Sequence, residues 1–169
     1  MGDVFKEQIV KRKDPPTNNI KRAVLVIAVI VLFFVLAQTQ LGSLAAPITL
    51  AAAFGAFYLM SFLRVEYEYV FTNGDLDIDI IYNRSRRKQV FSANVKTFEI
   101  MAHVEDAVHA GNFSGALETR DYSSGEVGGN TYAFLVSIEG KQTKVIFEPN
   151  EKMMQAIAGS IPSSKLHRK

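Results

Sequence analysis

Two long apolar segments lie in the first half of the chain. Ala23–Ala37 and Leu44–Leu63 contain no Asp, Glu, Lys, Arg or His, and the connector between them is also uncharged. A bilayer core of about 30 Å needs roughly 20 helical residues at about 1.5 Å each, and the stretch from Ala23 to Leu41 nearly supplies that length. The pattern predicts a transmembrane helical hairpin. Its predicted spans are about 22–41 and 44–64.

The connector and the second span contain small residues with structural interpretations. Gly42 is expected to take the left-handed conformation that ends the first helix, and Ser43 to cap the second. The second span contains two pairs of small residues four apart: Ala51 with Gly55, and Ala52 with Ala56. Such pairs allow close packing against the first span, but small residues are also common in membrane helices without a packing role.

Beyond the apolar segments, the hydrophobic period changes to two. Apolar side chains alternate with polar ones on both sides of Asn73-Gly74, which predicts two strands joined by a two-residue turn. In that register the eight alternating apolar side chains share one face: Val65, Tyr67, Tyr69, Phe71, Leu76, Ile78, Ile80 and Tyr82. The register that the turn sets thus places all the apolar side chains on the face that would form the core, so we expect a β-hairpin here.

The opposite face of this hairpin is acidic. The same register places Glu68 opposite Asp79, an unfavourable pair on its own, so basic neighbours are expected. A third strand beyond a turn at residues 83–85 would place Arg86 and Lys88 beside these acids. The basic run therefore has two interpretations, pairing with acidic strands or binding phosphate or anionic lipid. Its members are Arg84, Arg86, Arg87 and Lys88.

Further alternation predicts the rest of a β-domain. A fourth strand is expected over residues 95–102 and another over 116–122, while glycines between 103 and 130 mark turns. A second hairpin is expected with a turn at Gly140-Lys141 and the pairs 138 with 143, 136 with 145 and 134 with 147. Pro149 and Asn150 open a final helix. Its apolar stripe consists of Met153, Met154, Ile157 and Ile161.

The segment before the first span has its own pattern. Phe5 and Ile9 are four residues apart and precede a Pro15-Pro16 break, which we interpret as a short interfacial helix. A secretory signal peptide is the alternative, with small-residue cleavage motifs ending at Ala37 or Ala45. Its basic region would be unusually long, however, and a second apolar span would begin almost at the cut.

Charge predicts the topology of the hairpin. Residues 1–22 carry six basic and three acidic side chains, whereas residues 64–169 carry thirteen and fourteen. Basic residues flank both spans and do not occur in the connector, so the positive-inside rule predicts a two-span cell-membrane protein with both termini cytoplasmic. The basic N-terminal segment either attracts anionic lipid or only determines topology. The nearly neutral remainder argues against a nucleic-acid partner.

These elements predict a membrane-anchored α+β protein. Its domains would be a cytoplasmic basic segment (1–22), two transmembrane helices (23–63), a β-domain with a C-terminal helix (65–162) and a tail (163–169). Six or seven antiparallel strands closed by a helix are the plan of a pleckstrin-homology-like (PH-like) barrel or sandwich. We therefore expect an N-terminal transmembrane hairpin followed by a PH-like antiparallel β-domain.

Four stretches of sequence carry a family resemblance: GDVFKEQIVKRK near the start, then EYEYVFTNGDLDID, FEIMA and FEPNEKM. Through them the chain resembles a family of small uncharacterised two-span bacterial membrane proteins with a C-terminal PH-like domain. It resembles more loosely the bacterial PH-like domains that are attached to a transmembrane hairpin. The resemblance implies a fold and an anchor, and it carries no catalytic residues.

One cluster of metal-capable side chains occurs: His103, Glu105, Asp106 and His109. Its order differs from the helix-borne H-E-x-x-H motif, and the following Gly111 favours a solvated loop. The chain has no cysteine, which excludes disulfides and thiolate chemistry. The spans contain no ionisable residue that would mark an ion path. We therefore predict no catalytic residue, no metal site and no cofactor.

The predicted function is a non-enzymatic interaction or scaffolding module beside the inner leaflet. Its partners would be the lipid bilayer and either a protein partner or further copies of the chain. The alternative is sensing of anionic lipid or of the membrane surface through the basic run. An enzyme that uses His103 and Glu105 is a third class, and it would lose turnover when these residues are replaced. No small-molecule ligand can be identified from the sequence.

Overall fold

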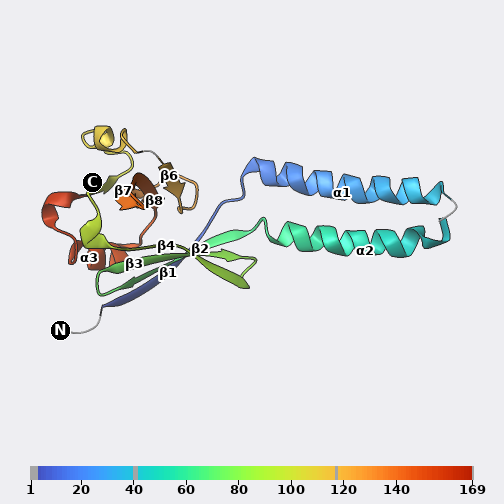
Figure 1. The fold of residues 1–169 in the computed structure, drawn as a ribbon, viewed down its shortest axis with the longest axis horizontal. Coiled ribbons are helices and arrows are strands. Elements are labelled where there is room, and N and C mark those ends of the chain that lie inside the picture. Colours follow the sequence, from blue (N-terminus) through green and yellow to red (C-terminus); the bar gives the residue numbers. More distant parts are fainter. Residues whose placement is uncertain (1–3, 40–41, 117, 169) are drawn as a thin grey trace. The chain divides into compact units, whose positions relative to one another are not determined.

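The computed structural model describes residues 4–39, 42–116 and 118–168. The chain divides into two compact units, whose elements are labelled in Figure 1. One unit is continuous from Asp14 to Val65, and the other joins residues 1–13 to residues 66–169. The β-containing unit is therefore interrupted in sequence by the helical one, so the predicted boundary at residue 65 leaves out its first strand.

The helical unit consists of α1 (Pro16–Ala37) and α2 (Gly42–Ser61). α1 begins earlier than the predicted residue 22, because proline is well suited to the first turn of a helix. The prediction that Gly42 takes a left-handed conformation is wrong, since Gly42 is the first residue of α2. Gln40 and Leu41, which belong to the predicted connector, lie outside the described residues.

α1 and α2 contact each other along a seam with alternating spacings of four and three residues. The less exposed positions of α1 are Asn18, Arg22, Leu25, Val29, Leu32 and Leu36. Those of α2 include Ala45, Thr49, Ala52, Ala56 and Met60. This spacing is typical of antiparallel helices packed at a shallow angle, with large side chains on one helix against small ones on the other. Of the two predicted small-residue pairs, Ala52 with Ala56 is half-buried, whereas Ala51 and Gly55 are exposed.

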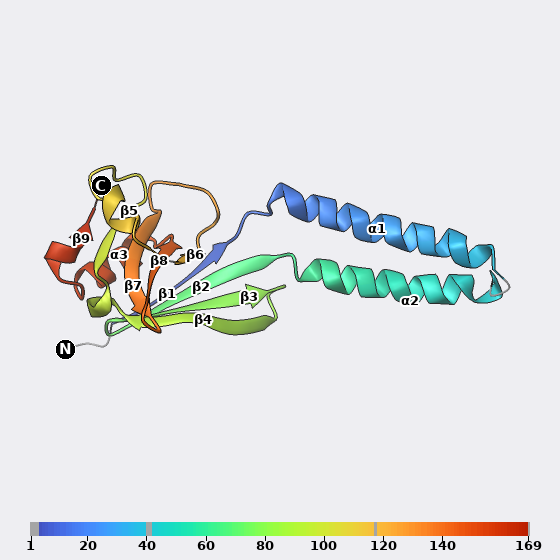
Figure 2. The ribbon, with the colours of Figure 1, turned by 45° about the horizontal axis from the view of Figure 1, so that its top comes forward.

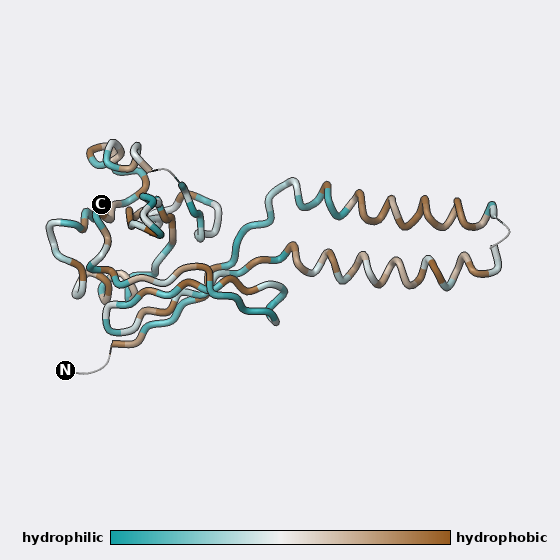
Figure 3. The backbone as a smooth tube through the Cα atoms, viewed as in Figure 1, coloured by the Kyte–Doolittle hydropathy of each residue, from teal (hydrophilic) through white to brown (hydrophobic). Residues whose placement is uncertain are grey.

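The remaining surface of both helices is apolar and exposed, and the brown segments that recur along both helices in Figure 3 mark their hydrophobic residues. Ile20, Phe34 and Phe57 are 64%, 62% and 74% exposed. Contiguous apolar surface of this kind is unfavourable in water. Both helices are long and apolar enough to cross a membrane.

The first sheet of the β-containing unit has the strand order β1-β2-β3-β4. β1 (Phe5–Lys11) pairs antiparallel with β2 (Val65–Thr72), with Phe5 opposite Thr72 and Lys11 opposite Glu66. The predicted interfacial helix over the N-terminal segment is therefore wrong. A spacing of four residues places Phe5 and Ile9 on one face of a strand as well as of a helix, and the backbone of β2 pairs with the strand.

The predicted hairpin at Asn73-Gly74 is confirmed. Both residues have positive φ (51° and 104°), as a two-residue type I′ turn requires, and β3 (Asp75–Tyr82) follows at once. The five alternating apolar residues nearest the turn are buried: Tyr67, Tyr69, Phe71, Leu76 and Ile78. β4 (Arg86–Asn94) pairs antiparallel with β3, and Figure 2 shows β2, β3 and β4 as long neighbouring strands.

The second sheet has the order β6-β8-β7-β5-β9. Its strands are β5 (Ile100–His103), β6 (Glu118–Asp121), β7 (Tyr132–Ile138), β8 (Lys141–Phe147) and β9 (Leu166–His167). The β6–β8 and β5–β9 pairs are parallel, which corrects the expectation of an entirely antiparallel domain. β7 and β8 pair with Ile138 opposite Lys141, so the predicted register is wrong by two residues. The turn is Glu139-Gly140, and a shift of two leaves each side chain on its predicted face.

The ends of the second sheet are completed by short elements. A 3-10 turn, η1 (Val95–Thr97), replaces the first part of the strand predicted over 95–102. The final helix, α3 (Glu151–Ala158), begins where predicted, because the Asn150 side chain accepts a 2.9 Å hydrogen bond from the Met153 backbone N–H. Residues 163–167, predicted to be a tail, form a 3-10 turn (η3, Ser163–Lys165) and β9.

Aromatic side chains from both sheets form the core. Phe134 of β7 stacks on Phe98 with a centroid distance of 3.9 Å and also contacts Phe91 of β4 and Phe147 of β8. In the same core, the Tyr69 hydroxyl donates a hydrogen bond to the backbone carbonyl of Tyr122, just after β6, and accepts one from the Glu148 backbone N–H. The two sheets and α3 thus enclose one apolar core, and the fold is α+β.

Polar contacts attach β1 to the second sheet as well as to β2. The Gln8 amide donates to the Glu148 carbonyl (2.9 Å) and accepts from the Asn150 N–H (2.6 Å). Beyond the strand, the Arg12 guanidinium donates to the Tyr67 hydroxyl at 2.6 Å. β1 is therefore an integral strand of the domain.

This architecture predicts that the domain needs β1. A chain in which residues 14–64 are replaced by a short Gly/Asn turn is expected to fold as a soluble monomer, because β1 still pairs with β2. Residues 65–169 alone should aggregate, since the edge of β2 is left unpaired. Size-exclusion chromatography of the two proteins tests this, and identical behaviour would show that β1 is dispensable.

Candidate functional site

Glu68 is a buried carboxylate on the face of β2 opposite the core. The residue is only 1% exposed, and its Oε1 forms a 2.9 Å ion pair with the Arg87 guanidinium. Its Oε2 is the one buried side-chain oxygen or nitrogen that lacks a hydrogen bond among the residues described. A buried carboxylate with half of its hydrogen-bonding capacity unused is costly to ionise.

Neighbouring acids make ionisation of Glu68 still less favourable. Glu7 projects from the same face of β1, because Ile9 is opposite Glu68 and Glu7 is two residues along the strand. Burial raises the pKa of Glu68; Arg87 opposes that rise, while the Glu7 carboxyl and the charge of Asp79 add to it. A proton on Glu68 removes its repulsion from the neighbouring acids, so Glu68 keeps its proton to a higher pH than an isolated glutamate does.

The basic run beside these acids is arranged differently from the prediction. The register of β3 and β4 shifts between Ile78 and Asp79, so that Phe91 is opposite Ile78 but Gln89 is opposite Asp79. This β-bulge reverses the alternation of the preceding residues. Arg87 and Gln89 therefore lie beside the acids, and the prediction that Arg86 and Lys88 do so is wrong.

The bulge divides the four cations between different environments. Arg87 pairs with Glu68, and the Arg84 guanidinium lies 3.5 Å from the Glu66 carboxylate. Arg86 and Lys88 are opposite Tyr82 and Ile80 and are exposed. The pairs of Arg84 and Arg87 agree with the structural interpretation of the run.

The predicted histidine cluster is also divided. His103 is 1% exposed, and its Nδ1 accepts the Glu105 backbone N–H at 3.2 Å while its Nε2 is 3.1 Å from the Gly128 carbonyl. These partners assign the neutral tautomer with the proton on Nε2. His109 lies elsewhere, with Nδ1 2.7 Å from Asp106 Oδ2. In the part of the chain that is described, no three metal-capable side chains form a group.

His109 also has a partner that sequence reasoning missed. Its ring stacks on that of His167 in β9, with a centroid distance of 3.7 Å. The two residues lie far apart in the sequence, and only the parallel pairing of β9 with β5 brings His167 to this edge. Local spacing carries no signal for such a contact.

A shallow polar depression of about 260 Å³ lies between α3 and the start of β7. Tyr132, Met154, Gln155 and Arg168 line part of it. The Arg168 guanidinium donates to the Met154 carbonyl at the end of the depression (3.2 Å). This is the helix-flanked surface of the domain that could accept a segment of another protein.

The carboxyl pair predicts a specific pH dependence of stability. The folded chain binds the Glu68 proton more tightly than the unfolded chain, whose glutamate has an ordinary pKa of 4.5. The free energy of unfolding should therefore fall as pH rises from that value through the raised pKa. Glu68→Gln should remove this fall, which denaturant titrations of the full chain in mild detergent at several pH values would measure.

The control for this experiment is Glu139→Gln, which removes a carboxylate from the exposed β7–β8 turn. This variant should keep the wild-type pH dependence. A Glu68→Gln protein that loses stability with rising pH as the wild type does would contradict the assignment.

The comparisons with known proteins agree with this architecture. A family model described as Bacterial PH-like domain (DUF6106) matches residues 2–166, which include β1, both helices and the two sheets. No curated protein and no solved structure matches the chain. Because the match covers nearly the whole sequence, the chain belongs to the family Bacterial PH-like domain (DUF6106).

Proposed function

We propose that this protein is a non-enzymatic, membrane-anchored interaction module. Its two helices anchor a PH-like domain at the cytoplasmic face of a cell membrane, where the domain binds a protein partner or a second copy. The observation that carries the proposal is the pairing of β1, which precedes the helical hairpin, with β2, which follows it. Anchoring raises the local concentration of the domain around other membrane proteins.

The β1–β2 pair supports a two-span topology. Strands that share backbone hydrogen bonds must lie on the same side of a membrane, since a bilayer interior cannot satisfy an open strand edge. If α1 crosses the bilayer, α2 must therefore return. Signal-peptide cleavage near Ala37 or Ala45 would remove β1 from the domain, which argues against that alternative.

Charge supports the cytoplasmic assignment. Lys21 and Arg22 precede the apolar part of α1, and Arg64 follows α2, whereas the described connector residues are uncharged. Cations are retained on the cytoplasmic side of short membrane hairpins.

A non-enzymatic function is supported by the state of the candidate catalytic residues. His103 is buried and held by backbone groups on both ring nitrogens, which leaves it no access to a substrate. His109, the other histidine of that cluster, has separate partners. We propose that a protein partner binds at the depression between α3 and the start of β7, and not at the histidines.

Recognition of anionic lipid headgroups by the basic run is the second candidate function. Arg84 contacts Glu66, and only Phe62–Val65 separate Glu66 from the end of α2 along the chain. Arg86 and Lys88, at the start of β4, are exposed as well. This geometry favours contact with anionic headgroups if α2 is inserted.

Cysteine labelling tests the topology, because the natural chain has no cysteine. Thr39→Cys should react with an impermeant reagent in intact cells, since it lies at the outer end of the hairpin. Lys11→Cys and Val127→Cys, both at exposed positions, should react only after permeabilisation. Opposite labelling of these last two would contradict the two-span topology, and labelling of both in intact cells would place the domain outside.

Site-specific photo-crosslinking tests the interaction surface. A photoreactive residue at exposed Gln155, beside the α3 depression, should give a crosslinked product of one defined mass in cells. The same residue at exposed Ser92 of β4 is the matched control and should give none. Uncrosslinked monomer from both positions counts against a protein partner, and crosslinking to lipid from position 88 supports the second candidate.

A further inference from the structure

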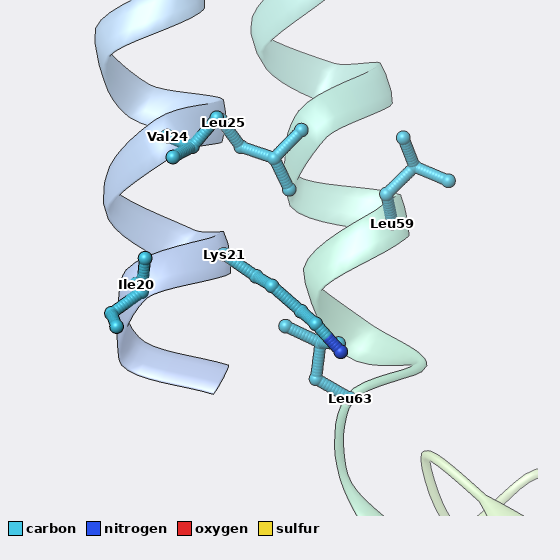
Figure 4. Close-up of a pocket in the computed structure, with 6 residues that line it drawn as sticks. All are labelled: Ile20, Lys21, Val24, Leu25, Leu59 and Leu63. Atoms are coloured by element: carbon cyan, nitrogen blue, oxygen red, sulfur yellow. The ribbon is translucent and has the colours of Figure 1, made fainter. Parts of the chain in front are cut away.

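A crevice opens between α1 and α2 at the end of the hairpin where both helices join the rest of the chain (Figure 4). Its volume is about 390 Å³, within the range of small-molecule sites. Six residues line it: Ile20, Lys21, Val24 and Leu25 from α1, Leu59 from α2, and Leu63 from the turn after α2. Five of the six are aliphatic, so the walls suit a hydrocarbon chain.

Lys21 gives this apolar crevice its one charged lining residue. Figure 4 shows its side chain extended from α1 across the crevice, with the ammonium near Leu63, which follows α2. Such a side chain covers apolar surface with its methylene stem and keeps its charged end free for an anion. The ammonium provides three hydrogen-bond donors, which suits the oxygens of a phosphate.

The cations around the crevice are not equivalent. The Arg22 guanidinium is 2.6 Å from the Asp14 carboxylate and donates to the Asn19 side chain, so its charge is largely compensated. Lys21 has no ion pair among the residues that the structure describes. Of the cations at this end of the hairpin, Lys21 is the one that lines the crevice, so an anionic ligand in the crevice would contact Lys21.

The base of the crevice is held in place by a contact between the helix ends. The Asn18 side chain, 7% exposed, donates to the Leu63 carbonyl at 3.3 Å. This bond fixes the spacing of the two helices where the polar and apolar parts of the hairpin meet. If the hairpin is inserted, that boundary lies at the level of the lipid headgroups.

We propose that this crevice is a binding site for an anionic phospholipid, with an acyl chain against the aliphatic walls and the phosphate at Lys21. The inference rests on the proposed membrane insertion of the hairpin. Basic pockets between helices on the cytoplasmic side are recognised settings for anionic headgroups. A zwitterionic lipid would bring its own cation beside Lys21 and bind less well.

The chain contains no tryptophan, which permits single-tryptophan reporters of lipid contact. Leu59→Trp places a reporter at the crevice, and Phe57→Trp places one on the exposed opposite side of α2 at similar depth. Each full-length variant is reconstituted with brominated phosphatidylglycerol or brominated phosphatidylcholine, and the quenching is compared.

The expected result is a preference for the anionic lipid at position 59 and none at position 57. The preference should be roughly fivefold, the factor equivalent to about 1 kcal/mol for one basic side chain at an anionic surface. Adding Lys21→Gln should abolish it, and Lys21→Arg should retain it. Lys152→Gln, which removes an exposed cation from α3, is the control and should change nothing.

Two outcomes separate failure of the site from failure of the anchor. Equal quenching by both lipids at position 59, or a preference unchanged by Lys21→Gln, would overturn the lipid site while membrane insertion stands. Absence of quenching at both positions would show that the hairpin is not inserted, and would overturn the proposed function together with the site.

Discussion

The backbone pairing of β1 with β2 is the interaction on which the rest of the architecture depends. It joins residues 5–11 to residues 66–72 across the whole helical hairpin. A flexible connection of that length would carry an entropic cost of closure. The antiparallel contact of α1 with α2, fixed at its base by the Asn18–Leu63 hydrogen bond, already returns the chain close to where it left. Helix packing and strand pairing are therefore mutually favourable.

The same pairing buries an ionisable group on the outer face of the sheet. β1 brings Glu7 and Ile9 over Glu68, and this burial raises the pKa of Glu68. Arg87 compensates part of the charge, which the β-bulge in β4 makes possible by turning that side chain toward β2. Buried ionic groups seldom add stability in themselves, but they do disfavour alternative registers.

Elements whose hydrophobic residues follow one period, either that of a helix or that of a strand, could be predicted from the sequence. The β2–β3 hairpin, the α3 helix with its Asn150 cap and the two apolar helices each combine periodicity with a matching turn or cap residue. β1 could not be recognised from the sequence, because Phe5 and Ile9, four residues apart, lie on one face of either a helix or a strand. Its pairing partner, β2, lies beyond the helical hairpin. No feature of the local sequence indicates the β-bulge near Val90. The face of the sheet on which Arg87 lies was therefore predicted wrongly.

The candidate sites show the same division. The basic run was visible as composition, whereas the pairing of Arg87, rather than Arg86 or Lys88, with Glu68 depends on one register shift. The crevice at Lys21 depends on two helices meeting, and the His109–His167 stack depends on β9 joining β5. Contacts between distant segments decide these arrangements, and a single sequence does not encode them in any local pattern.

The position of β1 ahead of the helices has a consequence for biogenesis. The strand is synthesised before the helices, yet it can pair only after both helices and β2 have been synthesised. If the hairpin spans a membrane, the strand must stay unpaired during that interval, on the side where synthesis continues. Two of its seven residues, Lys6 and Lys11, are lysines, and such cations disfavour both edge-to-edge aggregation and translocation of an unpaired strand. In a membrane, the domain could then be completed only when both ends of the hairpin lie on the same side, and a chain inserted in any other way would be left with an open sheet edge.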